Sequence, residues 1–179
     1  IPDLRISNTI FNKNIIGVYL KDNNNNMSPS TNNIIKNCVF TCRTLASTAP
    51  TAANFNVIKA ALYNGNYGSY PTTLTNNGKR SARGIRALEI GSATAYKIGV
   101  ANSAAPTNGV GNINIFDNLD YGIYIYDGNY IIKNNVFKNI TGNSGAGNIY
   151  SGAAFGTGIY AYSKFITQNI SIGGNLTTA

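Results

Sequence analysis

The feature that most constrains the fold of this chain is an internal sequence repeat. Residues 10–22 align without a gap on residues 115–127, with identities that include an Ile-Phe pair, a glycine, a tyrosine and an aspartate. Residues 32–44 align on residues 129–141, and 8 of the 13 positions are identical. In the first copy a polar insert separates the two blocks. Internal repeats with inserts at one place per repeat are typical of a solenoid.

Shorter matches extend the repeat toward the end of the chain. The run GIYIY at residues 122–126 returns as GIYAY at residues 158–162. In the best-matched neighbouring repeats, Phe116 and Phe137 are 21 residues apart. We therefore expect coils of about this length, with loop insertions between them.

Apolar and polar side chains alternate within each repeat. Successive side chains of a β-strand point to opposite faces, so Ile123 and Ile125 can face inward while Tyr124 and Tyr126 face outward. One coil cannot bury its apolar side alone, but the next coil, stacked at strand spacing, covers it. The inward positions should therefore form columns through one core. The matching pairs are Val18/Leu20, Ile123/Ile125 and Ile159/Ala161.

Asparagines occupy matching turn positions of the repeats. Asn tolerates left-handed backbone and hydrogen-bonds its own main chain, which suits it to sharp turns. Stacked on one another, these residues would form an asparagine ladder; the alternative is that Asn is simply common in this chain. The positions are Asn8, Asn37, Asn134 and Asn169.

These repeats, strands and turn asparagines resemble the right-handed parallel β-helix repeat family, the pectin-lyase-like superfold. The resemblance covers residues 6–44 and 112–175. It implies an all-β fold, a right-handed parallel β-helix, forming a single unit over residues 1–179. It implies no single activity, because this scaffold hosts lyases, hydrolases, epimerases, phage tailspikes and adhesins.

Composition narrows the class of protein. A chain of 179 residues can form one domain with a substantial core. Only 11% of the residues are charged, and there is no His or Trp. This balance suits a β-rich exterior protein, so we expect a secreted or cell-surface location. We expect no membrane span, because no run approaches the roughly 18 apolar residues that one needs, and no nucleic-acid partner, because no such motif occurs.

Both ends of the sequence look cut. Residues 4–6 begin in what should be a strand, and no polar cap follows residues 170–175. We expect a segment of a longer solenoid. Its terminal coils would expose unpaired strand edges, which predicts self-association through the solenoid ends.

Outside the clear repeats the pattern is weaker. Residues 54–63 alternate loosely and predict a strand. Residues 84–90 (GIRALEI) match the Gly-Ile frame of residues 122–126 and predict a strand in the same sheet, with a helix over residues 82–88 as the alternative. Residues 96–101 predict a further short strand.

The two cysteines, Cys38 and Cys42, lie four residues apart around a strand end. A disulfide would require suitable geometry, and two free thiols are equally compatible with the sequence. We expect no metal site and no cofactor, because there is no His and no further Cys to serve as a ligand.

The first candidate binding site is a set of tyrosines that the strand alternation turns outward. A tyrosine ring is flat and apolar with a polar tip, which suits stacking on sugar rings or on a partner protein. The alternative is that tyrosine is a good β-former that covers its strand neighbours. The set consists of Tyr19, Tyr124, Tyr126, Tyr160 and Tyr162.

The second candidate site is a basic cluster within a net charge of +8. A basic face attracts polyanions, which for an exterior protein favours acidic polysaccharide, teichoic acid or lipopolysaccharide. The alternative is a solvated charged loop that serves solubility. The cluster consists of Lys79, Arg80, Arg83 and Arg86.

Acid–base chemistry has little support in the sequence. The chain has six carboxylates, and glycoside hydrolysis needs two of them at a set separation. The Asn-Thr-Asp, Asp-Asp, His-Gly and Arg-x-Lys motifs of β-helix polygalacturonases are absent. Asp117 and Asp120 read as turn substitutions, and Asp22 and Asp127 as turn residues. We interpret all four as structural.

A polysaccharide lyase is a weaker alternative, because β-elimination can use Lys, Arg or Tyr as the base. The one trio that fits is Glu89 with Arg86 and with Lys97 on a neighbouring strand. No catalytic residue is assigned.

The sequence therefore favours a non-catalytic, adhesin-like β-helix module that binds polysaccharide, cell-surface glycan or another protein. One alternative is a fragment of a polysaccharide lyase, a hydrolase or a phage tailspike depolymerase. Another is a purely structural stalk.

Overall fold

The computed structural model describes residues 4–21, 34–46, 48–69, 83–90, 96–99, 112–140, 156–162, 170–173 and 176–178. Of the residues singled out in the sequence, Lys79, Arg80, Asp22 and Asn169 lie outside this described part.

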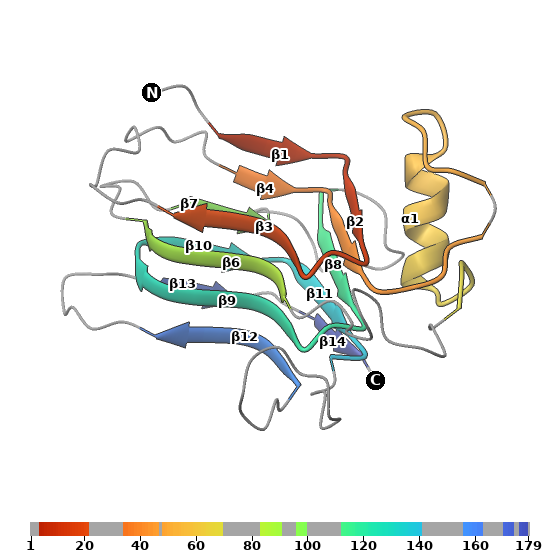
Figure 1. Ribbon diagram of the computed structural model, residues 1–179. Coiled ribbons are helices and arrows are strands. Elements are labelled where there is room, and N and C mark those ends of the chain that lie inside the picture. Colours follow the sequence, from red (N-terminus) through yellow and green to blue (C-terminus); the bar gives the residue numbers. More distant parts are fainter. Residues whose placement is uncertain are drawn as a thin grey trace.

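The strands of the described part form three parallel sheets that wind as a right-handed β-helix (Figure 1), as the repeats predict. Sheet A contains, in spatial order, β1 (Arg5–Ser7), β4 (Ile34–Lys36), β7 (Tyr96–Gly99), β10 (Tyr130–Lys133) and β13 (Ile170–Gly173). Sheet B contains β2 (Ile10–Asn12), β5 (Val39–Thr41), β8 (Asn114–Asp117), β11 (Asn135–Lys138) and β14 (Leu176–Thr178). Sheet C contains β3 (Ile16–Lys21), β6 (Arg83–Ile90), β9 (Tyr121–Gly128) and β12 (Thr157–Tyr162).

The strand register confirms the predicted columns. In sheet C one column is Val18, Ile85, Ile123 and Ile159, and the next is Leu20, Ala87, Ile125 and Ala161. The strands predicted over residues 84–90 and 96–101 are also present, as β6 and β7. Because parallel coils stack in register, one inward position per strand builds a continuous core.

Four phenylalanines stack along the inner face of sheet B. Phe11, Phe40, Phe116 and Phe137 have successive ring-centroid separations of 4.9, 4.8 and 5.0 Å. The spacing matches the distance between neighbouring strands, so the ladder follows from register alone. It joins the inward residues of all three sheets into one core.

The glycine that opens each sheet C repeat makes room for this ladder. A Cβ atom on Gly122 would lie 2.6 Å from a ring carbon of Phe137 and 2.7 Å from the main-chain oxygen of Gly158. Gly17 meets Phe40, and Gly84 meets Phe116, in the same way. Close packing against the next coil therefore requires glycine at these three positions, whereas a Cβ atom on Gly158 would meet Phe137 at an ordinary 3.4 Å.

Single residues in left-handed conformation turn the corners between the sheets. Between sheets A and B they are Asn8, Asn37 and Asn134, with φ of 54°, 53° and 55°. Between sheets B and C they are Lys13, Asn118 and Asn139, with φ of 60°, 54° and 49°. The predicted turn residue Asp127 has φ 52° and precedes Gly128 at the third corner. Asn and Asp adopt this conformation at lower strain than other side chains.

The asparagine ladder occurs in a different form from the predicted one. Asn37 donates to Asn8 across 2.5 Å, but the register places Ile113 between Asn37 and Asn134. A second ladder, one residue further along, is fully buried: Asn114 donates to Asn135 across 3.0 Å and accepts from the Cys38 main-chain N–H. These amides satisfy main-chain groups that would otherwise be buried without partners.

The predicted strand over residues 54–63 is wrong. The segment is α1 (Phe55–Tyr63), which lies on the outer side of sheet B, beside β2 and β8 in Figure 1. Ile58 and Leu62 pack on the outward aliphatic residues of that sheet, which are Val39, Ile115 and Val136. Phe55, Ile58, Lys59 and Leu62 follow the spacing of one helix face. Packing of this apolar face on the outer surface of sheet B favours a helix over a strand for this segment.

A buried ion pair fastens the corner between sheets B and C. Arg43 donates through Nε to Asp117 across 2.5 Å and through Nη2 across 3.2 Å. Asp117 also accepts from Thr41 at 2.9 Å and from Asn139 at 3.0 Å. The carboxylate thus joins three successive coils.

Candidate binding surface

The outer face of sheet C carries two columns of large side chains. Strand pairing aligns Tyr19, Arg86, Tyr124 and Tyr160 in the first column. It aligns Lys21, Leu88, Tyr126 and Tyr162 in the second. The predicted tyrosine set therefore shares one face of one sheet.

The tyrosines of neighbouring coils stack on each other. The ring centroids of Tyr124 and Tyr160 are 4.8 Å apart with 8° between the ring planes, and those of Tyr126 and Tyr162 are 5.2 Å apart with 21°. Tyr121, which the sequence reading missed, meets both Tyr124 and Tyr160 edge-on. Such pairs are worth about 0.5–1.5 kcal/mol each beyond the area that they bury.

Two arginines of β6 lie against these rings. The guanidinium carbon of Arg83 is 4.4 Å from the ring centroid of Tyr124 and 5.6 Å from that of Tyr121. That of Arg86 is 5.3 Å from the centroid of Tyr19. A guanidinium over an aromatic face is attracted by the ring quadrupole. The face is therefore a mixed tyrosine and arginine surface.

The basic cluster differs from its prediction. Arg83 and Arg86 lie on a strand rather than in a solvated loop, and Arg83 is only 7% exposed. The Nε atom of Arg86 is buried without a hydrogen-bond partner. The alternative of a solvated loop is therefore wrong for these two residues, whose positive charge is held within the tyrosine face.

Exposure of the tyrosines follows their position along the solenoid. Tyr19 is 50% exposed, Tyr160 40% and Tyr162 45%. They lie on β3 and β12, the outermost strands of sheet C. Tyr124 and Tyr126, on the inner strand β9, lie in the same outward columns but are half-buried. Their faces are occupied by neighbouring side chains, and the uncovered ring surface belongs to the edge tyrosines.

The three carboxylates whose side chains the structure describes are all buried. Asp117 and Asp120 are buried, and Asp127 forms a corner. Lys97 lies on β7 of sheet A and Arg86 on β6 of sheet C, so their predicted placement on neighbouring strands is wrong. The Glu89 side chain lies outside the described part. In the described residues there is no group of three or more His, Cys, Asp or Glu that could hold a metal ion.

A buried amine lies beneath α1, away from the tyrosine face. Lys59 is fully buried and donates to Asn37 Oδ1 at 2.6 Å and to the Ile113 main-chain oxygen at 2.8 Å. Burial lowers its pKa from 10.5 to about 8. Burial also raises the pKa of the nearby Cys38 thiol to about 11. Cys38 and Cys42 are both buried, and no disulfide joins them.

Comparisons with protein-family models, with curated proteins and with solved structures gave no match. No helix in the part of the chain that the structure describes has the length and apolar character needed to cross a membrane.

Proposed function

We propose that this chain is a non-catalytic, adhesin-like β-helix module of the pectin-lyase-like type, acting outside the cell or at its surface. Its outer sheet C face binds glycan or the surface of a partner protein. The observation that carries the proposal is the alignment of Tyr19, Arg86, Tyr124 and Tyr160 in one outward column, beside Tyr126 and Tyr162.

The chemistry of this face suits a polar, ring-containing ligand. Three edge tyrosines offer uncovered apolar ring surface with hydroxyl tips, which is what sugar rings stack on. Arg83 and Arg86 add positive charge at the same face. Charge placed there attracts anionic ligands over neutral ones.

The partial exposure of these large aromatic side chains is a second argument for a binding site. Exposed apolar clusters on a soluble protein commonly mark interaction sites. Self-stacking covers Tyr124 and Tyr126, but it leaves the outer edges of Tyr160 and Tyr162 open. A ligand that stacks on those edges would cover the area that the solenoid leaves exposed.

The test is a glycan-array screen of the 179-residue chain followed by titration of each hit. Two variants dissect the contact: Tyr19, Tyr160 and Tyr162 all changed to Ala remove the rings, and the same three changed to Phe remove only the hydroxyls. Val57→Ala is the matched control, because Val57 is 71% exposed on α1, on a different face.

The proposal predicts binding that the alanine variant lowers at least about tenfold and that Val57→Ala leaves unchanged. If ring stacking dominates, the phenylalanine variant retains affinity. Each hit is then assayed for new chain ends. Cleavage of the glycan would overturn the non-catalytic reading in favour of a depolymerase, and absence of any binding would favour a structural stalk.

A further inference from the structure

The outer face of sheet A carries a positive charge on each of four neighbouring strands. In each strand the charged residue directly precedes or follows an isoleucine that packs in the shared core, so strand alternation turns the charge outward. One of the four side chains is exposed, and the other three are half-buried. The four residues are Arg5 on β1, Lys36 on β4, Lys97 on β7 and Lys133 on β10.

The strand register fixes how these charges are spaced. Arg5 and Lys97 share one outward column, with β4 between them. Lys36 and Lys133 share the next column, on either side of Gly99. The charge therefore alternates between two columns from one coil to the next, at a strand separation of about 4.8 Å and a column separation of about 7 Å. The four residues form a narrow band along the solenoid axis, which we call the basic band.

The alternation lets the basic band hold like charges close together. Like charges directly opposite each other on neighbouring strands are destabilising, but each charge of the band lies beside an uncharged residue of the next strand. Those neighbours are Ser7, Ile34, Gly99 and Ile131. None of the five strands of sheet A contains Asp or Glu. The band is therefore a surface of one charge sign, which attracts anions.

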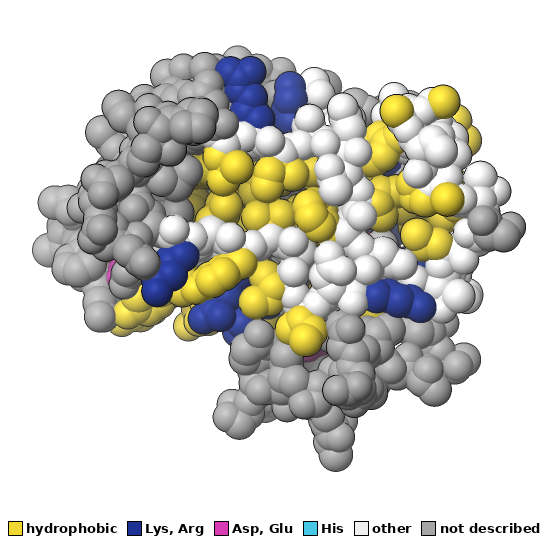
Figure 2. All heavy atoms as spheres, turned by 45° about the horizontal axis from the view of Figure 1, so that its top comes forward, with side chains coloured by type: hydrophobic (Ala, Val, Ile, Leu, Met, Phe, Trp, Pro, Cys, Tyr) yellow, Lys and Arg dark blue, Asp and Glu magenta, His cyan; other side chains and the backbone are white. Residues whose placement is uncertain are grey.

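The rest of the chain does not offset this charge. The sequence has 14 Lys and Arg against 6 Asp and Glu. Figure 2 shows the imbalance on one side of the molecule, where Lys and Arg side chains are plainly visible and Asp and Glu are almost hidden. A long-range attraction for polyanions therefore reinforces the local one.

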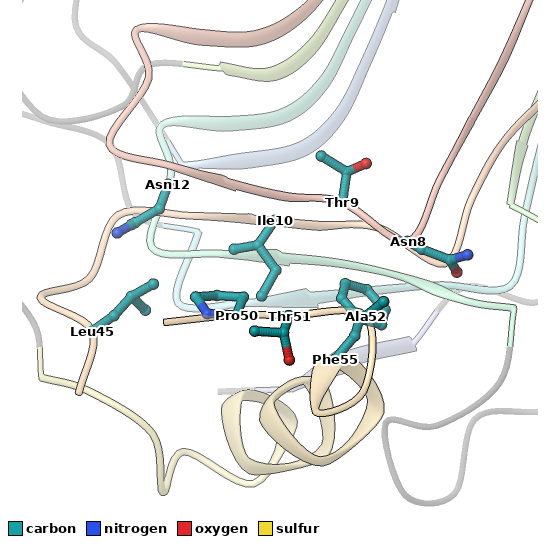
Figure 3. Close-up of a pocket in the computed structure, with 9 residues that line it drawn as sticks. All are labelled: Asn8, Thr9, Ile10, Asn12, Leu45, Pro50, Thr51, Ala52 and Phe55. Atoms are coloured by element: carbon teal, nitrogen blue, oxygen red, sulfur yellow. The ribbon is translucent and has the colours of Figure 1, made fainter. Parts of the chain in front are cut away.

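The basic band lies away from the tyrosine face and from the groove beside α1. Sheet A lies behind sheet C in Figure 1, with the shared core between them, so their outer faces point in opposite directions. The groove, of about 530 Å³, lies between β2 and the segment that leads into α1. Figure 3 shows the residues that line it, and none of those it labels is charged. A polyanion would therefore meet cations on sheet A but none in the groove.

The shape of the band favours a linear partner. Its charges follow the solenoid axis one per coil, whereas a planar anionic surface would be matched by charges spread over a whole face. Single-stranded nucleic acid is bound by aromatic side chains on which its bases stack. The outward positions of these four strands hold none, because Tyr96 and Tyr130 face the core. A polysaccharide with an anionic group on each sugar needs only a row of cations, with apolar side chains such as Ile34 between them.

We propose that the basic band binds a linear anionic polysaccharide, with an anionic group on each sugar, laid along the solenoid axis. Each of the four cations meets one anionic group of the polymer. Single charge pairs at a surface are weak, but pairs made by one polymer add, because each bound group raises the effective concentration of the next. The proposal does not depend on the function of the tyrosine face.

The first test compares charged and neutral forms of one polymer. Alginate is a linear polysaccharide with a carboxylate on each sugar, and esterification removes the charge but keeps the chain. We expect the 179-residue chain to bind end-labelled alginate oligomers saturably in fluorescence anisotropy, and the esterified oligomers at least about tenfold more weakly. Added salt should weaken the binding, because it screens surface charges. No binding of alginate at low salt, or equal binding of the esterified form, would overturn the proposal.

Two variants of equal net charge locate the contact. Lys36 and Lys133 both changed to Gln remove one column of the band and should lower the affinity for alginate at least about fivefold. Lys13 and Lys21 both changed to Gln remove two charges elsewhere, at the corner between sheets B and C and on the outer face of sheet C. This control should change affinity by less than about twofold.

The outcomes of this comparison are distinct. Equal losses in the two variants would show that net charge alone governs binding, and a greater loss in the control would move the site to sheet C. Either result would overturn the proposal, as would unchanged affinity in the first variant. Circular dichroism reports whether each variant keeps its fold.

Lysine acetylation of the unmodified chain locates the site without a variant. Bound alginate should slow acetylation of Lys36, Lys97 and Lys133 and leave Lys13 and Lys21 reactive, as read by peptide mass spectrometry. Slowing confined to Lys21 would place the polymer on the tyrosine face and overturn the proposal. A single-stranded polynucleotide that binds more tightly than alginate and protects the same three lysines would replace the polysaccharide with nucleic acid.

Discussion

The outer faces of sheets B and C belong to the same coils but differ in their side chains and in whether a helix covers them. On sheet B the outward residues are aliphatic, and α1 covers Val39, Ile115 and Val136. On sheet C most of the outward residues are tyrosines and arginines, beside Lys21 and Leu88, and no described helix covers them. In a single-layer solenoid, each outward position is either buried under an insert or left at the surface.

The difference shows that an insert, more than the repeat, decides which face becomes core. The helix lies in the coil that contains β4, β5 and β6. It is part of an insert between β5 and β6. Aliphatic side chains beneath it gain from burial. Tyrosine and arginine can stay at a surface, because each combines apolar area with a polar group.

The junction between the two sheets should be the most sensitive point. Arg43→Ala would leave the Asp117 carboxylate buried without its charge partner. Removing one member of a buried pair typically costs about 3–5 kcal/mol, so the free energy of unfolding should fall by that much. Urea denaturation measures it. Changing Arg43 and Asp117 together to apolar residues should restore part of the loss; a double variant that is no more stable than Arg43→Ala would contradict this account.

The contact between α1 and sheet B should be the next most sensitive. Leu62 is fully buried against that sheet, and Leu62→Ala should lower the free energy of unfolding by about 3 kcal/mol through lost burial and the cavity left behind. Tyr162→Ala on the sheet C face is the comparison in the same denaturation experiment. Equal losses at the two positions would refute the contrast between a covered and an uncovered face.

The buried amine under α1 gives the helix-covered side of the solenoid a pH response. The pKa of Lys59 is lowered to about 8 in the folded state, so the unfolded chain binds more protons between pH 8 and 10.5. Stability from this group is therefore reduced below pH 8 and recovers as pH rises, by about 1 kcal/mol between pH 7.5 and 9. The raised pKa of Cys38 acts in the opposite sense above pH 9.

Lys59→Met should remove this rise between pH 7.5 and 9. Free energies of unfolding, measured by urea denaturation across that range, compare the variant with the original chain. Tyr160→Ala, on the other face, should keep the original slope. A Lys59→Met variant with an unchanged slope would show that another group titrates.

The tyrosine face should contribute least to stability. Tyr162→Ala removes one stacked ring on an outermost strand, and the loss should stay within about 0.5–1.5 kcal/mol. Its larger effect should be on ligand binding. Thermal unfolding and the glycan titration, run on the same sample, separate the two effects; a greater stability loss than that of Leu62→Ala would make the face a structural element.

Much of the fold could be predicted because the repeats encode register directly. Ile123 and Ile125 align with Val18 and Leu20 in the sequence, and the structure stacks them in the same columns. The turn asparagines were recognisable, since left-handed backbone favours Asn. The buried ladder of Asn114 and Asn135 could have been found from the shared Asn-aliphatic-Phe text of residues 114–116 and 135–137.

The site was less accessible to sequence reasoning. Alternation put the tyrosines on one face but carried no information on the partners that half-bury Tyr124, because those come from other coils. From the sequence, Arg83 was grouped with a basic cluster that could be a loop. In the structure it lies on β6, beside Tyr121 and Tyr124.

The sequence by itself determined the coil, its inward columns, the turn asparagines between sheets A and B, and the face that carries the tyrosines. These depend on local backbone preference and on a period that neighbouring repeats share. Only the tertiary structure decided that residues 55–63 form a helix, that Lys59 is buried, that Arg43 pairs with Asp117, and which tyrosines stay open. Each of those features depends on contacts between segments far apart in the chain. Local sequence patterns do not predict which distant residues will surround a given side chain.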